Sequence, residues 1–103
     1  MNHWNIPLSL EAEVRERDTT CIYCGLVFGS VHGHGSRASW EHIVNDASII
    51  TRENIALCCR SCNSSKGARL LEDWFTSPYC KRRGICRETV AEVVKIALLQ
   101  SSN

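Results

Sequence analysis

Side chains that could carry out chemistry lie between two pairs of cysteines and directly after the second pair. Glu41 and His42 place a carboxylate beside an imidazole, and two amide side chains follow at Asn54 and Asn63. A neutral histidine, with an ordinary pKa of about 6.5, can accept a proton from water at neutral pH. Carboxylate and amide oxygens are hard ligands that suit Mg²⁺ or Mn²⁺. Phosphodiester hydrolysis needs these parts, a base for water and a cation for the phosphate.

The paired cysteines predict a structural zinc site. Cys21-Ile-Tyr-Cys24 and Cys59-Arg-Ser-Cys62 each leave two residues between thiolates, so one tight turn can aim both at one ion. Two such turns complete a closed Cys₄ site, which would compensate for the small core of a chain of 103 residues. Cys58 is a rival ligand, but a Cys58–Cys62 pair breaks the tight spacing, so we favour Cys59. The other cysteines are expected to be buried or free thiols: Cys58, Cys80 and Cys86.

Length and composition favour one soluble, intracellular domain. The N-terminus lacks the basic start and long apolar run of a signal peptide, and no apolar stretch reaches membrane-spanning length. We therefore expect a cytoplasmic protein in which the paired cysteines, four of the seven, bind a metal rather than form disulfides. The net charge of +1 is far from the strongly basic balance of many DNA-binding proteins, although basic residues gather in the second half.

Hydrophobic periodicity indicates the elements that must position these residues. It predicts, in order, a helix, two strands and two further helices over residues 9–18, 39–44, 54–58, 63–75 and 87–100. In the fourth element, Leu70 and Trp74 have the i,i+4 spacing of a buried face. A basic connector is expected over residues 78–84. The last element carries an apolar stripe, which either packs on the core or forms a two-fold homodimer contact.

These motifs together resemble the HNH endonuclease family in its HNN form. The resemblance rests on segments in the family's order and spacing: Arg15-Glu-Arg-Asp18, Cys21-x-x-Cys24-Gly25, Glu41-His42-Ile43, Asn54-Ile-Ala-Leu and Cys59-x-x-Cys62-Asn63-x-x-Lys66-Gly67. It implies a small α+β fold in which a zinc-stapled ββα-metal core, about residues 13–76, grips duplex DNA. Helices would flank this core at both ends, and residues 1–103 would form a single HNH nuclease domain.

The resemblance also implies a role for each residue of the centre. His42 would be the general base that activates water, and Asn54 would hold the loop between the strands and orient that base. Glu41 and Asn63 would bind the catalytic Mg²⁺ or Mn²⁺. Glu41 stands where the family usually has Asp, and Asn63 where it often has His. Lys66 would contact a phosphate of the substrate.

Other features leave alternatives open. A helix that begins near Asn63 would direct its N-terminal amides at a phosphate, with Ser64 and Ser65 in its first turn, or Asn63 would simply cap it. His32 and His34, in a Gly-rich loop, are expected to be exposed. Two rival functions remain: a non-catalytic Cys₄ module that binds nucleic acid or protein, and a nuclease that acts on RNA or single strands.

Overall fold

The computed structural model describes residues 4–101, so the ends of the expected domain, residues 1–3 and 102–103, lie outside it. The described residues form a small α+β structure with two antiparallel strands and five α-helices. The elements are α1 (Leu8–Arg17), the 3₁₀ turn η1 (His34–Ser36), β1 (Ala38–His42), β2 (Ile55–Cys59), α2 (Arg60–Lys66), α3 (Leu71–Phe75), α4 (Pro78–Arg83) and α5 (Glu92–Ser101). No helix in this part of the chain is long and apolar enough to cross a bilayer.

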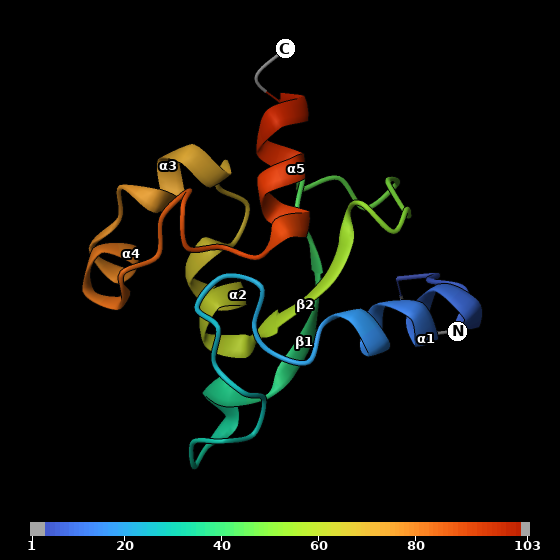
Figure 1. Ribbon diagram of the computed structural model, residues 1–103, viewed down its shortest axis with the longest axis horizontal. Helices are drawn as coiled ribbons and strands as arrows, with labels where there is room; N and C mark the ends of the chain where they lie inside the picture. Colours follow the sequence, from blue (N-terminus) through green and yellow to red (C-terminus); the bar gives the residue numbers. More distant parts are fainter. Residues whose placement is uncertain (1–3, 102–103) are drawn as a thin grey trace.

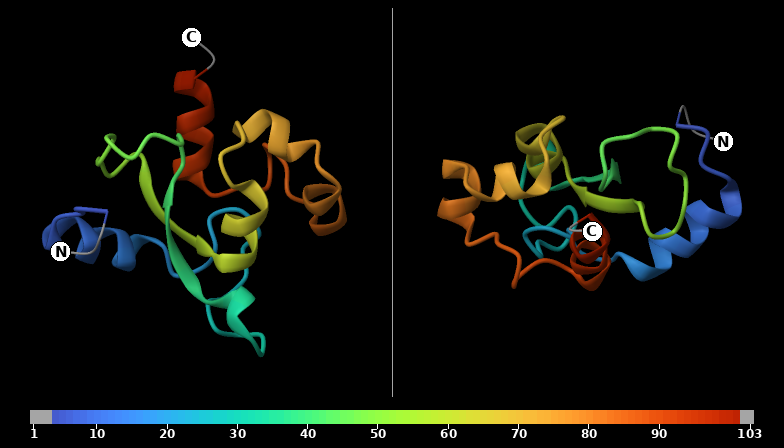
Figure 2. Two further views of the ribbon diagram at one scale, coloured as in Figure 1. Left: turned by 180° about the vertical axis from the view of Figure 1, so that it is seen from behind. Right: turned by 90° about the horizontal axis from the view of Figure 1, so that it is seen from above.

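β1 and β2 form a twisted ribbon at the centre of the molecule. Ala38 lies opposite Cys59, and His42 lies opposite Ile55. Figures 1 and 2 show α1 on one side of this ribbon and α2, α3 and α4 on the other. Successive side chains of a strand point to opposite faces, so neighbouring residues of β1 enter different layers.

Each face of the ribbon is covered by its own apolar cluster. Ile55 and Leu57 of β2 pack with Val14 of α1 in the smaller cluster. Ala56 and Cys58 face the larger cluster. Its other buried members include Tyr23, Trp74, Val90, Val94, Ala97 and Leu98. The apolar stripe of the C-terminal helix is therefore covered within the chain.

Arg17 and Asp18 fasten the end of α1 to the ribbon. Asp18 Oδ2 accepts a hydrogen bond from the Leu57 amide at 3.1 Å. Arg17 donates to the carbonyl oxygens of Ile55 at 2.8 Å and Arg52 at 2.6 Å, and its guanidinium also bonds to Asp18. Charge-assisted bonds of this kind are about twice as strong as neutral ones. They fix α1 beside β2.

α2 begins at Arg60, earlier than the helix expected from residue 63. Cys59 is its N-cap, and Cys59 Sγ accepts a hydrogen bond from the Cys62 amide at 3.5 Å. A cap of this kind satisfies an amide that lacks a partner within the helix. The second cysteine pair thus forms the first turn of α2. The sequence instead predicts that the helix begins after this pair.

The helix expected over residues 63–75 is also interrupted. Gly67, with φ of 52°, lies in a region that favours glycine and ends α2. α3 starts only after Leu70, which is exposed rather than buried. The expected connector over residues 78–84 is instead mostly helical as α4, because the Ser77 side chain caps it and Pro78 suits its first position.

α5 begins at Glu92 rather than near residue 87. A turn precedes it, in which Thr89 Oγ1 accepts a hydrogen bond from the Cys86 amide at 2.9 Å. The Ala91 amide then donates to the Ile22 carbonyl at 2.8 Å. These bonds lead the chain across the first cysteine turn before the helix can start.

Candidate functional site

The four expected zinc ligands come together in the structure. Their sulfur atoms all lie within 4.8 Å of one another, and Cys24 Sγ is 3.8 Å from Cys59 Sγ. A tetrahedral zinc ion with Zn–S bonds of about 2.3 Å needs sulfur atoms about 3.8 Å apart. The cluster, Cys21, Cys24, Cys59 and Cys62, therefore fits a structural metal such as zinc.

The two cysteine turns share one local design. The Cys24 amide donates to Cys21 Sγ at 3.5 Å, and the Cys62 amide donates to Cys59 Sγ at the same distance. Tyr79 also donates its hydroxyl to Cys62 Sγ at 3.3 Å. Hydrogen bonding with Cys21 lowers the pKa of Cys24 and raises the pKa of Cys62.

The remaining cysteines lie outside the cluster, which contains Cys59 and not Cys58. Cys58 points into the larger apolar cluster, where burial raises its pKa and keeps it a neutral thiol. Cys80 is buried and Cys86 is half-buried. These three behave as ordinary thiols of a small core.

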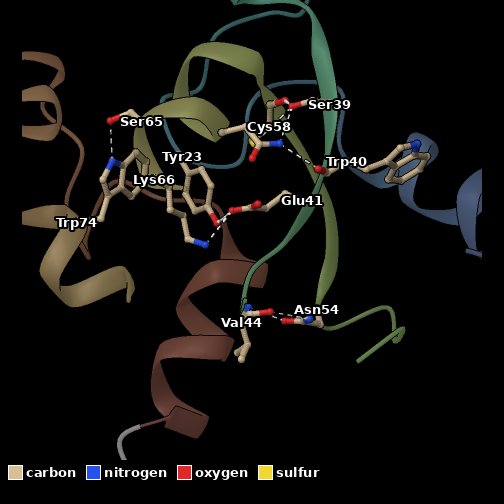
Figure 3. Close-up of polar contacts among 11 residues, drawn as sticks. Tyr23, Ser39, Trp40, Glu41, Val44, Asn54, Cys58, Ser65, Lys66 and Trp74 are labelled. Carbon is tan, nitrogen blue, oxygen red and sulfur yellow. Dashed lines mark hydrogen bonds and ion pairs between the residues drawn. The ribbon is translucent and has the colours of Figure 1, made fainter. Parts of the chain in front are cut away.

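Glu41 faces the α2 side of the ribbon and is held by two buried partners (Figure 3). Tyr23 donates its hydroxyl to Glu41 Oε2 at 2.6 Å, and Lys66 Nζ lies 3.1 Å from the same oxygen. Glu41 is 6% exposed and Lys66 is 1% exposed. Burial is the main cause that raises the pKa of Tyr23, and the Glu41 carboxylate raises it further. The Tyr23 hydroxyl therefore keeps its proton and remains a donor. Lys66 thus lies inside the protein rather than at a surface where it would meet a phosphate.

His42 lies on the opposite face of β1 and is 7% exposed. Its ring meets the edge of the Trp4 indole, with ring centroids 5.0 Å apart. His42 Nε2 is buried and has no hydrogen-bond partner among residues 4–101. Burial lowers the pKa of His42 from its ordinary 6.5, against opposing effects of Glu41 and Asp46. The imidazole is therefore neutral at pH 7.

Asn54 closes the loop between the strands. Its Oδ1 accepts a hydrogen bond from the Val44 amide at 2.7 Å, and its Nδ2 donates to the Val44 carbonyl at 3.2 Å (Figure 3). The same Nδ2 also donates to the Ile49 carbonyl at 3.1 Å. The Ile43 amide also donates to the Asn54 carbonyl at 3.0 Å. One side chain thus fixes the backbone immediately after His42.

Asn63 ties α2 to β1. Its Nδ2 donates to Ser39 Oγ and to the Trp40 carbonyl, each at 3.0 Å. Because the amide nitrogen is engaged with the strand, Oδ1 is the atom of this side chain suited to a ligand. Ser64 and Ser65 follow Asn63 along α2 and do not form its first turn. Ser65 Oγ instead accepts a hydrogen bond from Trp74 Nε1 at 3.0 Å.

A groove of about 460 Å³ runs between α2 and β1, and we call it the α2–β1 groove. Its lining includes Trp4, Arg37, Trp40, Arg60, Asn63 and Ser64. Trp4, Arg37 and Arg60 were not expected from the sequence to belong to the site. Arg37 follows the Gly-rich loop, Arg60 is a spacer of the second cysteine pair, and Tyr23 is a spacer of the first. His32 and His34 are exposed, as expected.

Comparison with known proteins assigns no family to this chain. No family model, no curated protein and no solved structure matches it. The function must therefore be argued from the side chains and their surroundings.

Proposed function

We propose that this protein is a metal-dependent endonuclease of the HNH type, with a ββα-metal core, that hydrolyses phosphodiester bonds in DNA. The observation that carries the proposal is the state of His42. Its Nε2 is buried and has no partner among residues 4–101, and its pKa is lowered by burial. An unsatisfied buried polar atom costs roughly 1–3 kcal/mol, and a purely structural histidine would ordinarily have a partner. A role as the acceptor of a proton from water explains why Nε2 has no partner within the protein.

The order and packing of the elements support this reading. β1, β2 and α2 follow one another, β1 carries His42, and α2 carries Asn63. Asn54 holds the loop directly after the base. A base on a strand fixed in this way has little freedom to turn away from a bound substrate, and such positioning lowers the barrier to reaction.

Glu41 and Asn63 are the residues that would hold the catalytic cation. Both contacts given above for Glu41 engage Oε2, so Oε1 is the oxygen that would bind the cation. Asn63 would contribute Oδ1, because its nitrogen is bonded to β1. These are hard oxygen donors. When bound, Mg²⁺ or Mn²⁺ would supply positive charge for the phosphate and for the leaving oxygen.

In this mechanism His42 Nε2 accepts a proton from a water molecule as that water attacks the phosphorus. The bond to the leaving oxygen breaks on the opposite side. Because Nε2 is enclosed in the free protein, substrate binding has to open access to it. Trp4, which packs against the ring, is the residue whose displacement would do so. Lys66 and Tyr23 act through Glu41 and are positioning residues.

A second function, a zinc module that binds nucleic acid without cleaving it, is favoured by one contact. Glu41 is already paired with Lys66, as a purely structural carboxylate would be. The two functions differ in their response to divalent cations. A nuclease needs Mg²⁺ or Mn²⁺ for turnover, whereas a binding module shows no product with either.

The test compares substrates and cations with the zinc-loaded protein. Labelled duplex DNA, single-stranded DNA and RNA are each incubated with Mg²⁺, with Mn²⁺, or with no added divalent cation. The proposal predicts cation-dependent cleavage, fastest on duplex DNA. Faster cleavage of RNA or single strands would change the proposed substrate class but not the proposed metal-dependent hydrolysis of phosphodiester bonds. No cleavage of any substrate by a folded, zinc-loaded protein would favour the binding module.

A further inference from the structure

Arg37 and Arg60 are brought side by side by the end of the ribbon. The Arg60 amide donates to the Arg37 carbonyl at 2.9 Å, one position beyond the pair of Ala38 and Cys59. Both arginines are exposed. Like charges at opposite positions of a β-ladder destabilise it. Two cations placed in this way therefore indicate a purpose other than stability.

Neither guanidinium is neutralised by the protein. Within residues 4–101, no ion pair and no side-chain hydrogen bond involves Arg37 or Arg60, and the lining of the α2–β1 groove holds no carboxylate. Other arginines of the chain do have acidic partners: Arg15, Arg17, Arg52 and Arg87. The positive charge of the groove is therefore available to an anion from outside.

The groove borders one of the proposed cation ligands and a neighbour of the proposed base. Asn63 lines it directly, and Trp4 lines it while touching the ring of His42. Its volume of about 460 Å³ lies within the range of roughly 300–1,000 Å³ typical of ligand sites. An anion held by the two arginines would thus lie in the same groove as Asn63, at the end of β1 opposite to His42.

We infer that the α2–β1 groove binds the phosphate backbone of a polynucleotide, with Arg37 and Arg60 as its phosphate contacts. Guanidinium groups suit this ligand, because they are always charged and match phosphate oxygens in bidentate fashion. The inference rests on the proposed function for its choice of a polynucleotide over a free anion. It assigns substrate binding to two residues outside the catalytic set.

The inference is tested by binding, measured apart from cleavage. The zinc-loaded protein, without added Mg²⁺ or Mn²⁺, is titrated into a fluorescent DNA duplex over a series of salt concentrations. Arg37→Ala, Arg60→Ala and the double variant are compared with Arg82→Ala, which removes an exposed arginine of α4 that does not line the groove. Zinc content and the denaturation midpoint are measured for each variant, and Arg60→Glu provides a second probe of the same position.

Each single variant is expected to lower affinity, and the double variant to lower it by about tenfold or more at moderate salt. The slope of log K against log salt should fall in magnitude by about one for each arginine removed. Arg60→Glu should weaken binding more than Arg60→Ala, and Arg82→Ala should leave affinity and slope near those of the wild type. Inorganic phosphate at the concentration of the duplex phosphates should not displace the duplex.

Unchanged affinity and slope in the double variant would overturn the inference, and so would the absence of binding by the wild type. Equal displacement by inorganic phosphate would reduce the groove to a free-anion site and also overturn it. Failure of this inference is distinguishable from failure of the nuclease. Normal cleavage by the double variant would support the proposed nuclease and contradict phosphate binding in the α2–β1 groove. Loss of binding in the double variant, when the wild type cleaves no substrate, would support phosphate binding in the α2–β1 groove and contradict the proposed nuclease.

Discussion

Lys66 Nζ lies 3.1 Å from Glu41 Oε2, and the two side chains are buried together between α2 and β1 (Figure 3). Tyr23 donates to the same oxygen at 2.6 Å. A buried pair of this kind adds little net stability, because both charges lose their hydration, but it is costly to break. It joins the helix that carries Asn63 to the strand that carries His42.

Removal of Lys66 should therefore destabilise the protein strongly. Lys66→Met leaves the Glu41 carboxylate buried without its cation, and the free energy of unfolding should fall by about 3–5 kcal/mol. The double variant Lys66→Met/Glu41→Gln should recover much of this loss, because a neutral amide can still accept the Tyr23 hydroxyl. Urea denaturation of the zinc-loaded proteins measures both, with exposed Lys81→Met as the control. Equal stability of the single and double variants would contradict the assignment of this pair.

The cysteine cluster should bind one zinc ion per chain and should be required for folding. Metal analysis of Cys62→Ser should show loss of zinc, because the cluster then lacks one thiolate. Cys86→Ser should retain zinc, because Cys86 lies outside the cluster. A chelator should unfold the wild type, as seen by circular dichroism, since metal binding in small domains is worth roughly 10–16 kcal/mol. A zinc-free protein with unchanged thermal unfolding would contradict this.

Asn54→Ala should loosen the loop after His42. The variant removes hydrogen bonds to the backbone of Val44 and Ile49, at a cost of about 0.5–1.5 kcal/mol for each bond lost. The Val44 amide should exchange its hydrogen faster by a corresponding factor. Asn45→Ala, at an exposed neighbouring position, is the matched control. An unchanged exchange rate at Val44 would show that the side chain does not hold the loop.

Trp4→Ala should raise the pKa of His42. Burial is the main cause that lowers this pKa below 6.5, and the Trp4 indole is one of the groups that packs on the ring. Because a general base is active only when neutral, the acidic limb of the cleavage profile should move to higher pH in the variant. An NMR titration of the imidazole follows the same change without reference to activity. A pKa that stays the same or falls would contradict this role for Trp4.

The cluster of four cysteines and the helix–strand–strand–helix order could be predicted from the sequence, because both depend on local spacing. The surroundings of Lys66 could not. The family resemblance implied that Lys66 contacts a phosphate, whereas its burial depends on Tyr23 and Glu41, which are distant in sequence. The start of α2 was also missed, because a cysteine sulfur acts as the cap in place of the usual hydroxyl or carboxylate.

The central claim, that His42 is the base of a nuclease, is tested most directly by cleavage of supercoiled plasmid. Wild type and His42→Ala are compared with Mg²⁺ or Mn²⁺, after equal zinc content and circular dichroism have been established. The account predicts cation-dependent nicking by the wild type and a loss of about 10²–10⁴-fold in the variant, the usual contribution of a general base. Equal cleavage by a folded His42→Ala protein, or none by the wild type, would contradict it.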